Sequence, residues 1–289
     1  MVKRFENAAA YSFLGPFLLI YVLFTVYPVF QALWMSAFDW DLLSVSREFL
    51  GFQNYREMLF GDPSFWRTLG NTVVFVLLSS PLIIGVGLLL ALGLSGPRGG
   101  WLRTVFFSPY VLSVAVTTLL WGFMLNPQQG LIGAALKAVG LPPLAWLTNP
   151  DLAMHGIVIT TLWWTVGFNM VLFIAGLQDI DGFLYEAATI DGAGPVRKFF
   201  SITLPGLKHT LTTVAILQII ASFQIFGQVH IMTRGGPGGA TRVLIQYIYE
   251  TGFRDFRLGY ASAMSVVLFI VMFGVSMVQL RISRRGEVE

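Results

Sequence analysis

Six long apolar stretches constrain the fold of this chain more strongly than any other feature of its sequence. They lie at about residues 11–36, 69–94, 104–125, 154–177, 207–232 and 258–280. Each exceeds the roughly 20 residues that a helix needs to cross the hydrocarbon core of a bilayer. Lys208, the second residue of the fifth stretch, is the only Asp, Glu, Lys or Arg within them. Because a backbone in lipid has to satisfy its own hydrogen bonds, we predict an all-α membrane protein with six transmembrane helices, in which residues 1–289 form a single transmembrane domain.

The composition excludes several other classes of protein. Hydrophobic residues make up 55% of the chain and charged residues 11%, with a mean hydropathy of +0.72, whereas soluble domains contain about 25% charged residues. The chain has no cysteine, which excludes disulfides and thiolate metal sites, and we expect neither a metal nor a cofactor. A net charge of +3 is too small to indicate nucleic-acid binding. The first stretch is too long for a signal-peptide core and lacks a good cleavage site after it, so we expect it to be retained.

A polar segment, residues 178–206, lies between the fourth and fifth stretches. Asp181 stands where its carboxylate can cap a short helix that ends near Ile190. Gly192 is placed to end that helix, and Pro195 to open the next one. Pro205 is expected to start the following membrane helix, at a position where its missing N–H costs little.

A spaced motif runs through this segment, in the sequence EAATIDGAGPVRKFFSITLP. Its positions are Glu186, Ala187, Ala188, Gly192, Ile202, Leu204 and Pro205. The spacing resembles the EAA loop of ABC importer permeases, which are membrane subunits that dock on a cytoplasmic ATPase. The resemblance implies that these residues, together with Asp191, form an ATPase-docking surface. The alternative interpretation is an amphipathic connector between two membrane helices.

Three further segments extend the resemblance over most of residues 11–281. They are LGFQNYREMLFGDPSFWRTLGNT at 50–72, the Gly-rich TRGGPGGAT at 233–241, and LGYASAMSVVL at 258–268. They are similar to segments of binding-protein-dependent ABC sugar importer permeases, of the maltose, glycerol-phosphate and oligosaccharide type. Taken alone, the Gly-rich segment is equally typical of a flexible surface turn.

Membership of this family would imply a type I ABC importer permease fold and alternating access to the two sides of the membrane. It would also imply four kinds of partner besides the lipid bilayer: a second homologous permease, two cytoplasmic ABC ATPase subunits, an extracytoplasmic solute-binding protein and a sugar substrate. The expected location is a bacterial or archaeal cytoplasmic (inner) membrane.

The distribution of basic residues predicts an orientation. If the N-terminus is cytoplasmic, ten of the 18 Lys and Arg residues fall in the inner segments, which are short, and eight are spread over longer outer loops. The higher inner density follows the positive-inside rule. Both termini and the segment 178–206 would then be cytoplasmic, where an ATPase could reach it.

Catalytic motifs are absent from the sequence. It contains no G-x-x-x-x-G-K-[ST] phosphate loop, no H-E-x-x-H and no G-x-S-x-G. We therefore expect a non-catalytic transport subunit, with ATP hydrolysis carried out by a partner. A channel, a secondary carrier or a membrane-embedded enzyme are alternatives from other classes. Carriers commonly keep ionisable side chains inside their membrane helices, and the interiors of these stretches have none.

Polar and aromatic residues in the fourth and fifth stretches are candidates for a substrate pathway. The candidates are Thr161, Trp164, Thr165, Phe168 and Asn169 in the fourth stretch, and Gln218 and Ser222 in the fifth, with Gln224 and Gln228 as a second pair. Amides and hydroxyls suit sugar hydroxyls, and aromatic rings suit the apolar faces of sugar rings. Such residues also hydrogen-bond neighbouring helices, and the partner permease could hold the site instead. The amide of Gln218 needs a partner from another helix or from the solute.

Other solutes are possible on the same fold, namely a polyol, a phosphorylated polyol or an amino acid. A phosphorylated solute would be expected to meet Arg or Lys in the pathway. The interiors of the six stretches supply neither.

Overall fold

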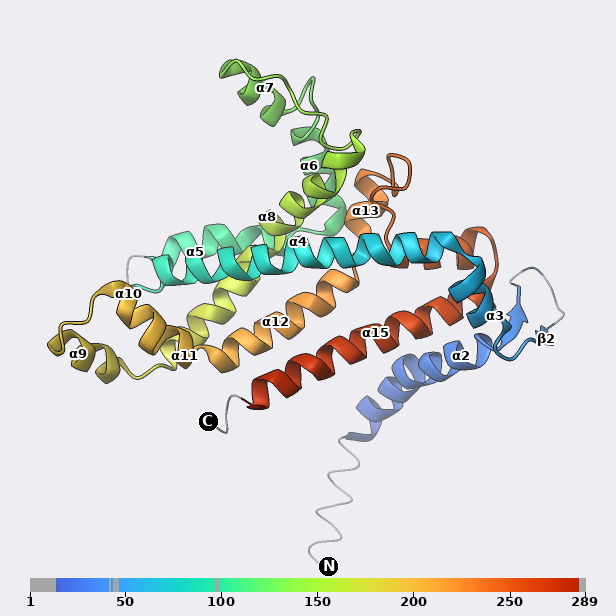
Figure 1. Ribbon diagram of the computed structural model, residues 1–289, viewed down its shortest axis with the longest axis horizontal. Coiled ribbons are helices and arrows are strands. Elements are labelled where there is room, and N and C mark those ends of the chain that lie inside the picture. Colours follow the sequence, from blue (N-terminus) through green and yellow to red (C-terminus); the bar gives the residue numbers. More distant parts are fainter. Residues whose placement is uncertain (1–13, 42, 44–46, 97–98, 286–289) are drawn as a thin grey trace, which may run out of the picture. The chain divides into compact units, whose positions relative to one another are not determined.

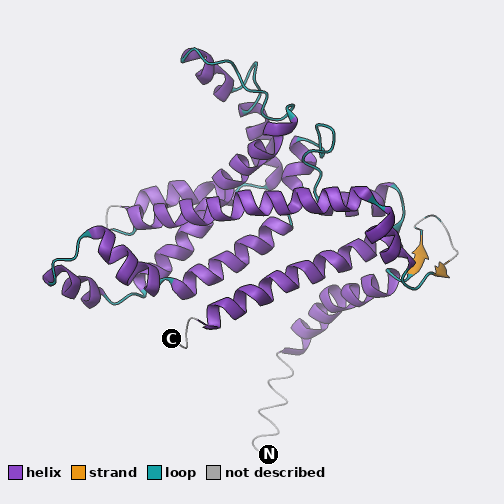
Figure 2. Cartoon of the chain, viewed as in Figure 1, coloured by secondary structure: helices purple, strands orange, loops and turns teal. Residues whose placement is uncertain are grey.

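The computed structural model describes residues 14–41, 43, 47–96 and 99–285. Helices dominate, and a small hairpin provides two strands (Figure 2). The chain divides into two compact units, which are described separately. The first takes residues up to Trp66 together with Tyr247–Ile270, and the second takes Arg67–Gln246 and the residues from Val271 onward. The all-α prediction is confirmed apart from the hairpin.

The first unit begins with the helix Leu14–Met35, which includes the π-helical turn η1 (Val22–Val26) and α2 (Tyr27–Met35). None of the residues in η1 and α2 is buried, as suits side chains solvated by lipid. The antiparallel strands β1 (Phe38–Trp40) and β2 (Arg47–Phe49) follow, with Asp39 opposite Glu48. The short helices α3 (Gln53–Arg56) and η2 (Glu57–Gly61) lead to α4 (Pro63–Leu94). The segments α14 (Leu244–Tyr249), η6 (Glu250–Arg254) and the start of α15 (Leu258–Arg285) complete the unit.

Asp62 connects distant parts of the first unit. Its Oδ2 atom accepts hydrogen bonds from the hydroxyls of Tyr247 at 2.6 Å and Tyr260 at 2.7 Å. Its Oδ1 atom accepts from the backbone N–H of Ser64 at 2.8 Å and so caps the start of α4. Burial would raise the pKa of Asp62, but the hydrogen bonds from the two tyrosines and from backbone N–H groups outweigh burial and lower it.

The second unit contains the remaining helices, which Figure 1 labels along the chain. They are α5 (Gly100–Phe107), η4 (Ser108–Val111), α6 (Val114–Met124), α7 (Leu131–Ala138), α8 (Pro150–Gln178), α9 (Gly182–Ile190), α10 (Pro195–Lys198), η5 (Phe199–Thr203), α11 (Leu204–Gly206), α12 (Lys208–Phe223) and α13 (Gly227–Met232). In this unit α8 runs from the α7 side to the α9 side (Figure 1). Most of α4 also belongs to it.

Five helical segments of the described chain are long and apolar enough to span a membrane. They are Leu14–Met35, Pro63–Leu94, Pro150–Gln178, Lys208–Met232 and Leu258–Arg281. The stretch predicted at 104–125 is not one continuous helix, because Gly100–Val111 and Val114–Met124 meet at 101°. Three local features account for the bend. Pro109 has no N–H to donate within a helix, the backbone is extended at Leu112 and Ser113, and the Ser113 side chain caps the start of α6. Six spans are reached only when this bent pair is counted as one.

The ends of three other spans also differ from the prediction. The second span starts at Pro63 rather than 69. Pro205 does not open the fifth membrane helix: it lies in the three-residue α11, and α12 starts at Lys208. The fifth span is further broken, since α12 ends at Phe223 and α13 begins at Gly227. The fourth span starts at Pro150 rather than 154, because Asn149 caps it by accepting from the N–H of Asp151 at 2.9 Å.

Two buried apolar clusters hold α8 against its neighbours in the second unit. One consists of Phe75, Met154, Ile157, Val158, Ile225, Val229 and Val243. The other consists of Ala91, Met170, Phe173, Ile174 and Val214. Along α8, the first cluster ends at residue 158 and the second begins at 170. The stretch of α8 between them is where the candidate pathway residues lie.

The Gly-rich segment 233–241 is held against the start of α4. Arg67 donates to the carbonyl of Gly238 at 2.6 Å. Asn71 donates to the carbonyls of Gly239 and Arg242, both at 2.9 Å. These bonds use backbone acceptors on both sides of the turn, so the segment is fastened to a helix rather than left as a free loop.

Candidate functional site

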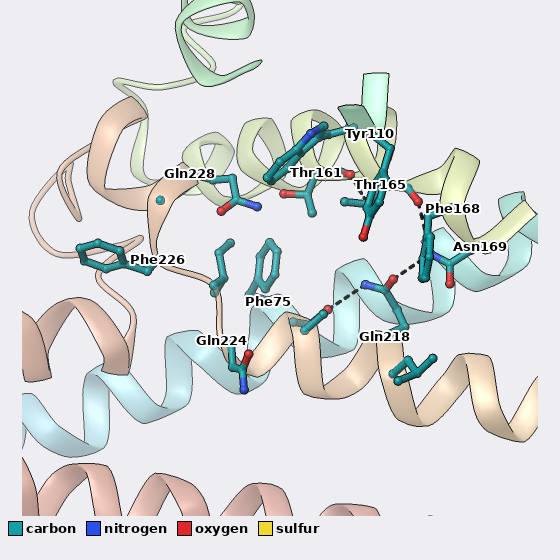
Figure 3. A pocket seen from close by; sticks show the side chains of 16 residues that line it. Phe75, Tyr110, Thr161, Thr165, Phe168, Asn169, Gln218, Gln224, Phe226 and Gln228 are labelled. Carbon is teal, nitrogen blue, oxygen red and sulfur yellow. Dashed lines mark hydrogen bonds between the residues drawn. The ribbon is translucent and has the colours of Figure 1, made fainter. Parts of the chain in front are cut away.

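A cavity of about 340 Å³ opens in the second unit, between the two apolar clusters of α8 (Figure 3). Its volume falls in the range of about 300–1,000 Å³ that is typical of small-molecule sites. It is lined by Phe75, Tyr110, Thr161, Trp164, Thr165, Phe168, Asn169, Leu217, Gln218, Ala221, Ser222, Gln224, Ile225, Phe226, Gly227 and Gln228. All seven residues predicted for the substrate pathway are among them. Their contact with a solute remains a prediction.

Aromatic rings form part of the cavity wall. Tyr110 and Phe168 stack with ring centroids 4.9 Å apart and planes 14° apart. The indole N–H of Trp164 donates to the backbone carbonyl of Leu112 at 3.1 Å, a group next to the bend between η4 and α6. Trp163 lies outside the lining and packs edge-on against Trp121 instead. The two neighbouring tryptophans therefore have different surroundings, as the 100° step of a helix predicts.

A chain of buried polar side chains, contributed by three helices, forms another part of the wall. Asn169 on α8 donates to the Oε1 atom of Gln218 on α12 at 2.9 Å. Gln218 in turn donates to the hydroxyl of Ser222 at 3.1 Å. Ser80 on α4 also donates to Ser222, at 3.1 Å. A neighbouring helix, and not a solute, thus supplies the partner that Gln218 requires.

The direction of the last hydrogen bond in this chain follows from counting lone pairs. The hydroxyl of Ser222 accepts from both Gln218 and Ser80, which occupies its two lone pairs. Its one proton is then directed to the hydroxyl of Ser79, which lies 3.2 Å away. Ser222 is therefore saturated by protein groups.

The break between α12 and α13 forms one end of the cavity, at residues 224–226. The N–H of Ile225 donates to the carbonyl of Ser222 at 3.3 Å, which closes the end of α12. Gly227 starts α13 against α6, where a Cβ atom would stand 2.7 Å from a methyl of Val114. A larger residue at position 227 would force Val114 to shift.

The electrostatic character of the lining is neutral. None of its sixteen residues, all within the described part of the chain, is Asp, Glu, Lys, Arg or His. The polar groups are two hydroxyls of α8, the amides of Asn169, Gln218, Gln224 and Gln228, and the hydroxyls of Ser222 and Tyr110. The cavity can hydrogen-bond an uncharged polar molecule and cover its apolar face, but it offers no counter-ion.

The segment 178–206 forms a helix–turn–helix on the side of α8 away from α7 (Figure 1). As predicted, Asp181 caps α9 by accepting from the N–H of Phe183 at 2.9 Å. Gly192 follows the helix with a φ of +73°, a conformation that favours glycine. The N–H of Ala193 bonds the carbonyl of Ala188 at 2.9 Å. Pro195 opens α10, also as predicted.

The predicted docking residues do not all lie on the surface of this segment. Glu186, Asp191, Gly192 and Pro205 are exposed, whereas Ala187, Ala188, Ile202 and Leu204 are partly buried. The hydroxyls of Tyr185 and Thr203 lie 2.9 Å apart and join the start of the segment to its end. The motif therefore supplies both surface groups and the packing that holds the turn.

Five large, exposed apolar residues of the segment were not predicted as docking residues. They are Phe183, Leu184, Ile190, Val196 and Phe200, and Ile190 has the largest exposed fraction, 88%. The signal that could have found them is the presence of large apolar side chains in a segment that is otherwise polar. Clusters of exposed apolar side chains mark sites of protein or membrane contact.

Comparison with known sequences gives a family for the chain. The sequence model described as "Binding-protein-dependent transport system inner membrane component" matches residues 83–286. The chain is 36% identical over 285 residues to the probable ABC transporter permease protein YurN of Bacillus subtilis, covering 96% of this chain and 97% of that protein. It is 37% identical over 282 residues to the sulfoquinovosyl glycerol transport system permease protein SmoG of Agrobacterium fabrum, covering 96% and 91%.

Comparison with solved structures supports the same fold. A chain of a bacterial alginate ABC transporter, solved in complex with an alginate pentasaccharide-bound periplasmic protein, superposes with a TM-score of 0.86 at 22% identity and covers 97% of this chain and 95% of its own length. The chain therefore belongs to the family of inner membrane components of binding-protein-dependent transport systems, which are the membrane-spanning, non-catalytic permease subunits of ABC importers.

Proposed function

We propose that this permease forms half of the translocation pathway for an uncharged sugar or glycoside, and that the cavity beside α8 holds the solute during transport. The observation that carries the proposal is the neutral lining, which combines stacked aromatic rings with amides and hydroxyls. Sugars present hydroxyls around an apolar ring face, and this lining complements both features. The relatives with named substrates include a diacetylchitobiose permease of Streptomyces coelicolor, 36% identical over 276 residues.

Anionic solutes fit the cavity less well. One relative, UgpA of Agrobacterium fabrum, 34% identical over 276 residues, is named as an sn-glycerol-3-phosphate permease. Phosphate and sulfonate groups are recognised in proteins by Arg, by Lys or by several N–H donors. The sixteen described lining residues include neither basic side chain. A neutral glycoside is therefore favoured over a phosphorylated polyol.

The segment 178–206 is proposed to dock on a cytoplasmic ATPase. Its exposed apolar residues would enter a groove of the partner, with Glu186 as the acidic group beside them. The segment connects α8 to α12, and these two helices supply most of the cavity lining. Movement of the segment by the ATPase would therefore be passed directly to both walls of the cavity, as alternating access requires.

The complete importer is proposed to contain a second homologous permease, two ATPase subunits and an extracytoplasmic solute-binding protein. The proposal is supported by the alginate transporter of the same fold, which was solved with a periplasmic protein bound. Both chain termini and the segment 178–206 are proposed to face the cytoplasm, on the strength of the Lys and Arg distribution.

The orientation is testable with single cysteines, because the chain has no native cysteine. A cysteine at Thr189 should react with an impermeant thiol reagent only after cells are permeabilised, and a cysteine at Gly238 should react in intact cells. Labelling of the Thr189 cysteine in intact cells would reverse the proposed orientation.

The transported solute is testable by reconstitution of the complete importer in proteoliposomes. We expect uptake of a neutral sugar that requires both ATP and the solute-binding protein, with no uptake of sn-glycerol-3-phosphate. A transporter that carries only phosphorylated or sulfonated solutes, or that transports without an ATPase, would contradict the proposal.

A further inference from the structure

Five polar side chains of the cavity lining are more than nine-tenths buried: Thr161, Asn169, Gln218, Ser222 and Gln228. Four of them hydrogen-bond protein groups. Thr161 donates to the carbonyl of Ile157 at 2.8 Å, and the other three form the polar chain described above. Among the hydrogen bonds of the described residues, Gln228 has none through its side chain. It is the one member of this buried set whose amide is uncommitted.

The amide of Gln228 is open to the contents of the cavity. The residue as a whole is 8% exposed, but its amide atoms are not among the fully buried side-chain atoms that lack a partner, and a polar group in such a site avoids a desolvation cost only when something hydrogen-bonds it. A primary amide offers two N–H donors and a carbonyl acceptor. Figure 3 shows the Gln228 side chain reaching into the cavity from α13. The groups that would satisfy it must therefore come from the contents of the cavity, either water or solute.

We infer that Gln228 is the side chain that selects the transported solute by hydrogen-bonding its hydroxyl groups, and that the Asn169–Gln218–Ser222 chain is a fixed wall. The inference rests on the proposed function of the cavity as the solute site. An amide can donate to one hydroxyl and accept from the next, so it suits a pair of adjacent hydroxyls on a sugar ring. The stacked rings of Tyr110 and Phe168 supply a surface for the apolar face of the same ring.

The position of Gln228 is fixed by the backbone on either side of it. It is the second residue of α13, directly after the break in the fifth span. On one side of it Gly227 packs against Val114 of α6. On the other side Val229 is fully buried in the apolar cluster at the start of α8. Because the backbone on both sides of Gln228 is packed against neighbouring helices, its amide enters the cavity from a fixed position.

The test compares glutamine-to-leucine substitutions in the assembled importer, reconstituted with its ATPase, partner permease and solute-binding protein. Uptake of tritiated maltose, trehalose, cellobiose and sucrose identifies a transported sugar, and the monodeoxy analogues of that sugar are then used as probes. In the wild type, removal of the hydroxyl that Gln228 contacts should slow uptake roughly five- to tenfold, the value of one hydrogen bond. Gln228→Leu should be slowed by a similar factor with the parent sugar, and should no longer discriminate that deoxy analogue from it.

A purely structural role for Gln228 would slow every sugar equally and leave the discrimination unchanged. Gln31→Leu is the matched control and should behave as the wild type, because Gln31 is an exposed glutamine of α2 outside both the cavity lining and the docking segment. Stimulation of the ATPase by the loaded binding protein should be retained in Gln228→Leu, which shows that the variant is folded and assembled.

The possible failures are distinguishable. If the wild type takes up a sugar and Gln228→Leu keeps the wild-type discrimination among the deoxy analogues, the role of Gln228 is refuted while the proposed function stands. If Gln228→Leu loses assembly, Gln228→Asn, which keeps a shorter amide, replaces it, and unchanged discrimination in that variant refutes the role. If the wild type takes up none of the sugars and imports a charged solute instead, the proposed function and this inference both fall.

Discussion

Replacement of Gln218 by leucine should weaken the packing of the second unit and leave the choice of solute unchanged. The side chain accepts from Asn169 of α8 at 2.9 Å and donates to Ser222 of its own helix, α12, at 3.1 Å. Leucine has a similar volume but neither bond. The substitution would leave an N–H of Asn169 without its partner in a buried site.

The magnitude follows from the two bonds. The bond to Asn169 joins two helices, and such bonds contribute on average about 0.6 kcal/mol, and up to about 1.7 kcal/mol. The bond to Ser222 lies within α12. A buried donor left without a partner costs about 1–3 kcal/mol. We expect Gln218→Leu to lower the free energy of unfolding by about 2 kcal/mol.

The assay is a double-mutant cycle with Asn169→Ala, read by the intrinsic tryptophan fluorescence of the protein during denaturation by SDS in mixed micelles. If Asn169 and Gln218 are hydrogen-bonded, the sum of the losses in unfolding free energy of the two single variants should exceed the loss of the double variant by roughly 0.6–1.7 kcal/mol. Strict additivity would refute the bond. A changed preference among sugars in Gln218→Leu would refute the assignment of Gln218 to a fixed wall.

Three further predictions concern other parts of the chain. Ile190→Asp should weaken co-purification of the ATPase by about tenfold or more, because it removes an apolar contact at the proposed interface. Val139→Asp changes an exposed residue outside the docking segment and should have no such effect. Equal effects of the two variants would contradict the docking surface. Gly227→Ala should reduce uptake because its methyl meets Val114, and Val114→Ala in the same chain should restore it; no rescue would show that the contact is not the cause. The hydrogen bonds to the Asp62 carboxylate lower its pKa. The stability that they add is therefore complete above the unfolded pKa of about 3.9 and is lost as the pH falls through the lower pKa of the folded protein. Melting temperatures measured from pH 6 to pH 3 should fall less steeply in Asp62→Asn than in the wild type, and parallel curves would contradict the assignment.

Local chemistry was the part of the structure that the sequence predicted best. Asp181 as a cap, Gly192 as the end of a helix and Pro195 as a helix start each depend on the properties of a single residue type. Apolar stretches likewise gave the positions of four spans to within a few residues, because the requirement to cover about 30 Å of hydrocarbon is local.

The roles of the polar residues in the cavity depend on partners that are distant in the sequence, and the sequence alone did not reveal these partners. Gln218 and Gln228 are both amides in the same apolar stretch, and nothing in their neighbours separates them. In the structure Gln218 is held by Asn169, which is 49 positions away in the chain, whereas Gln228 has no such partner. The bend at residues 112–113 was missed for a related reason: Pro109 and Ser113 signal a break, but apolar length alone does not reveal it.

The two broken spans account for the existence of a polar cavity in an otherwise apolar bundle. A break in a membrane helix frees backbone groups, and such breaks are tolerated where protein or a cavity satisfies them. The third span breaks at Leu112, whose carbonyl accepts from Trp164, and the fifth breaks just before Gly227, which packs against Val114. The two breaks therefore meet each other and adjoin the cavity. Because continuous helices would close this space with apolar side chains, the bends at Pro109–Ser113 and at residues 224–226 are as necessary to the site as the side chains that line it.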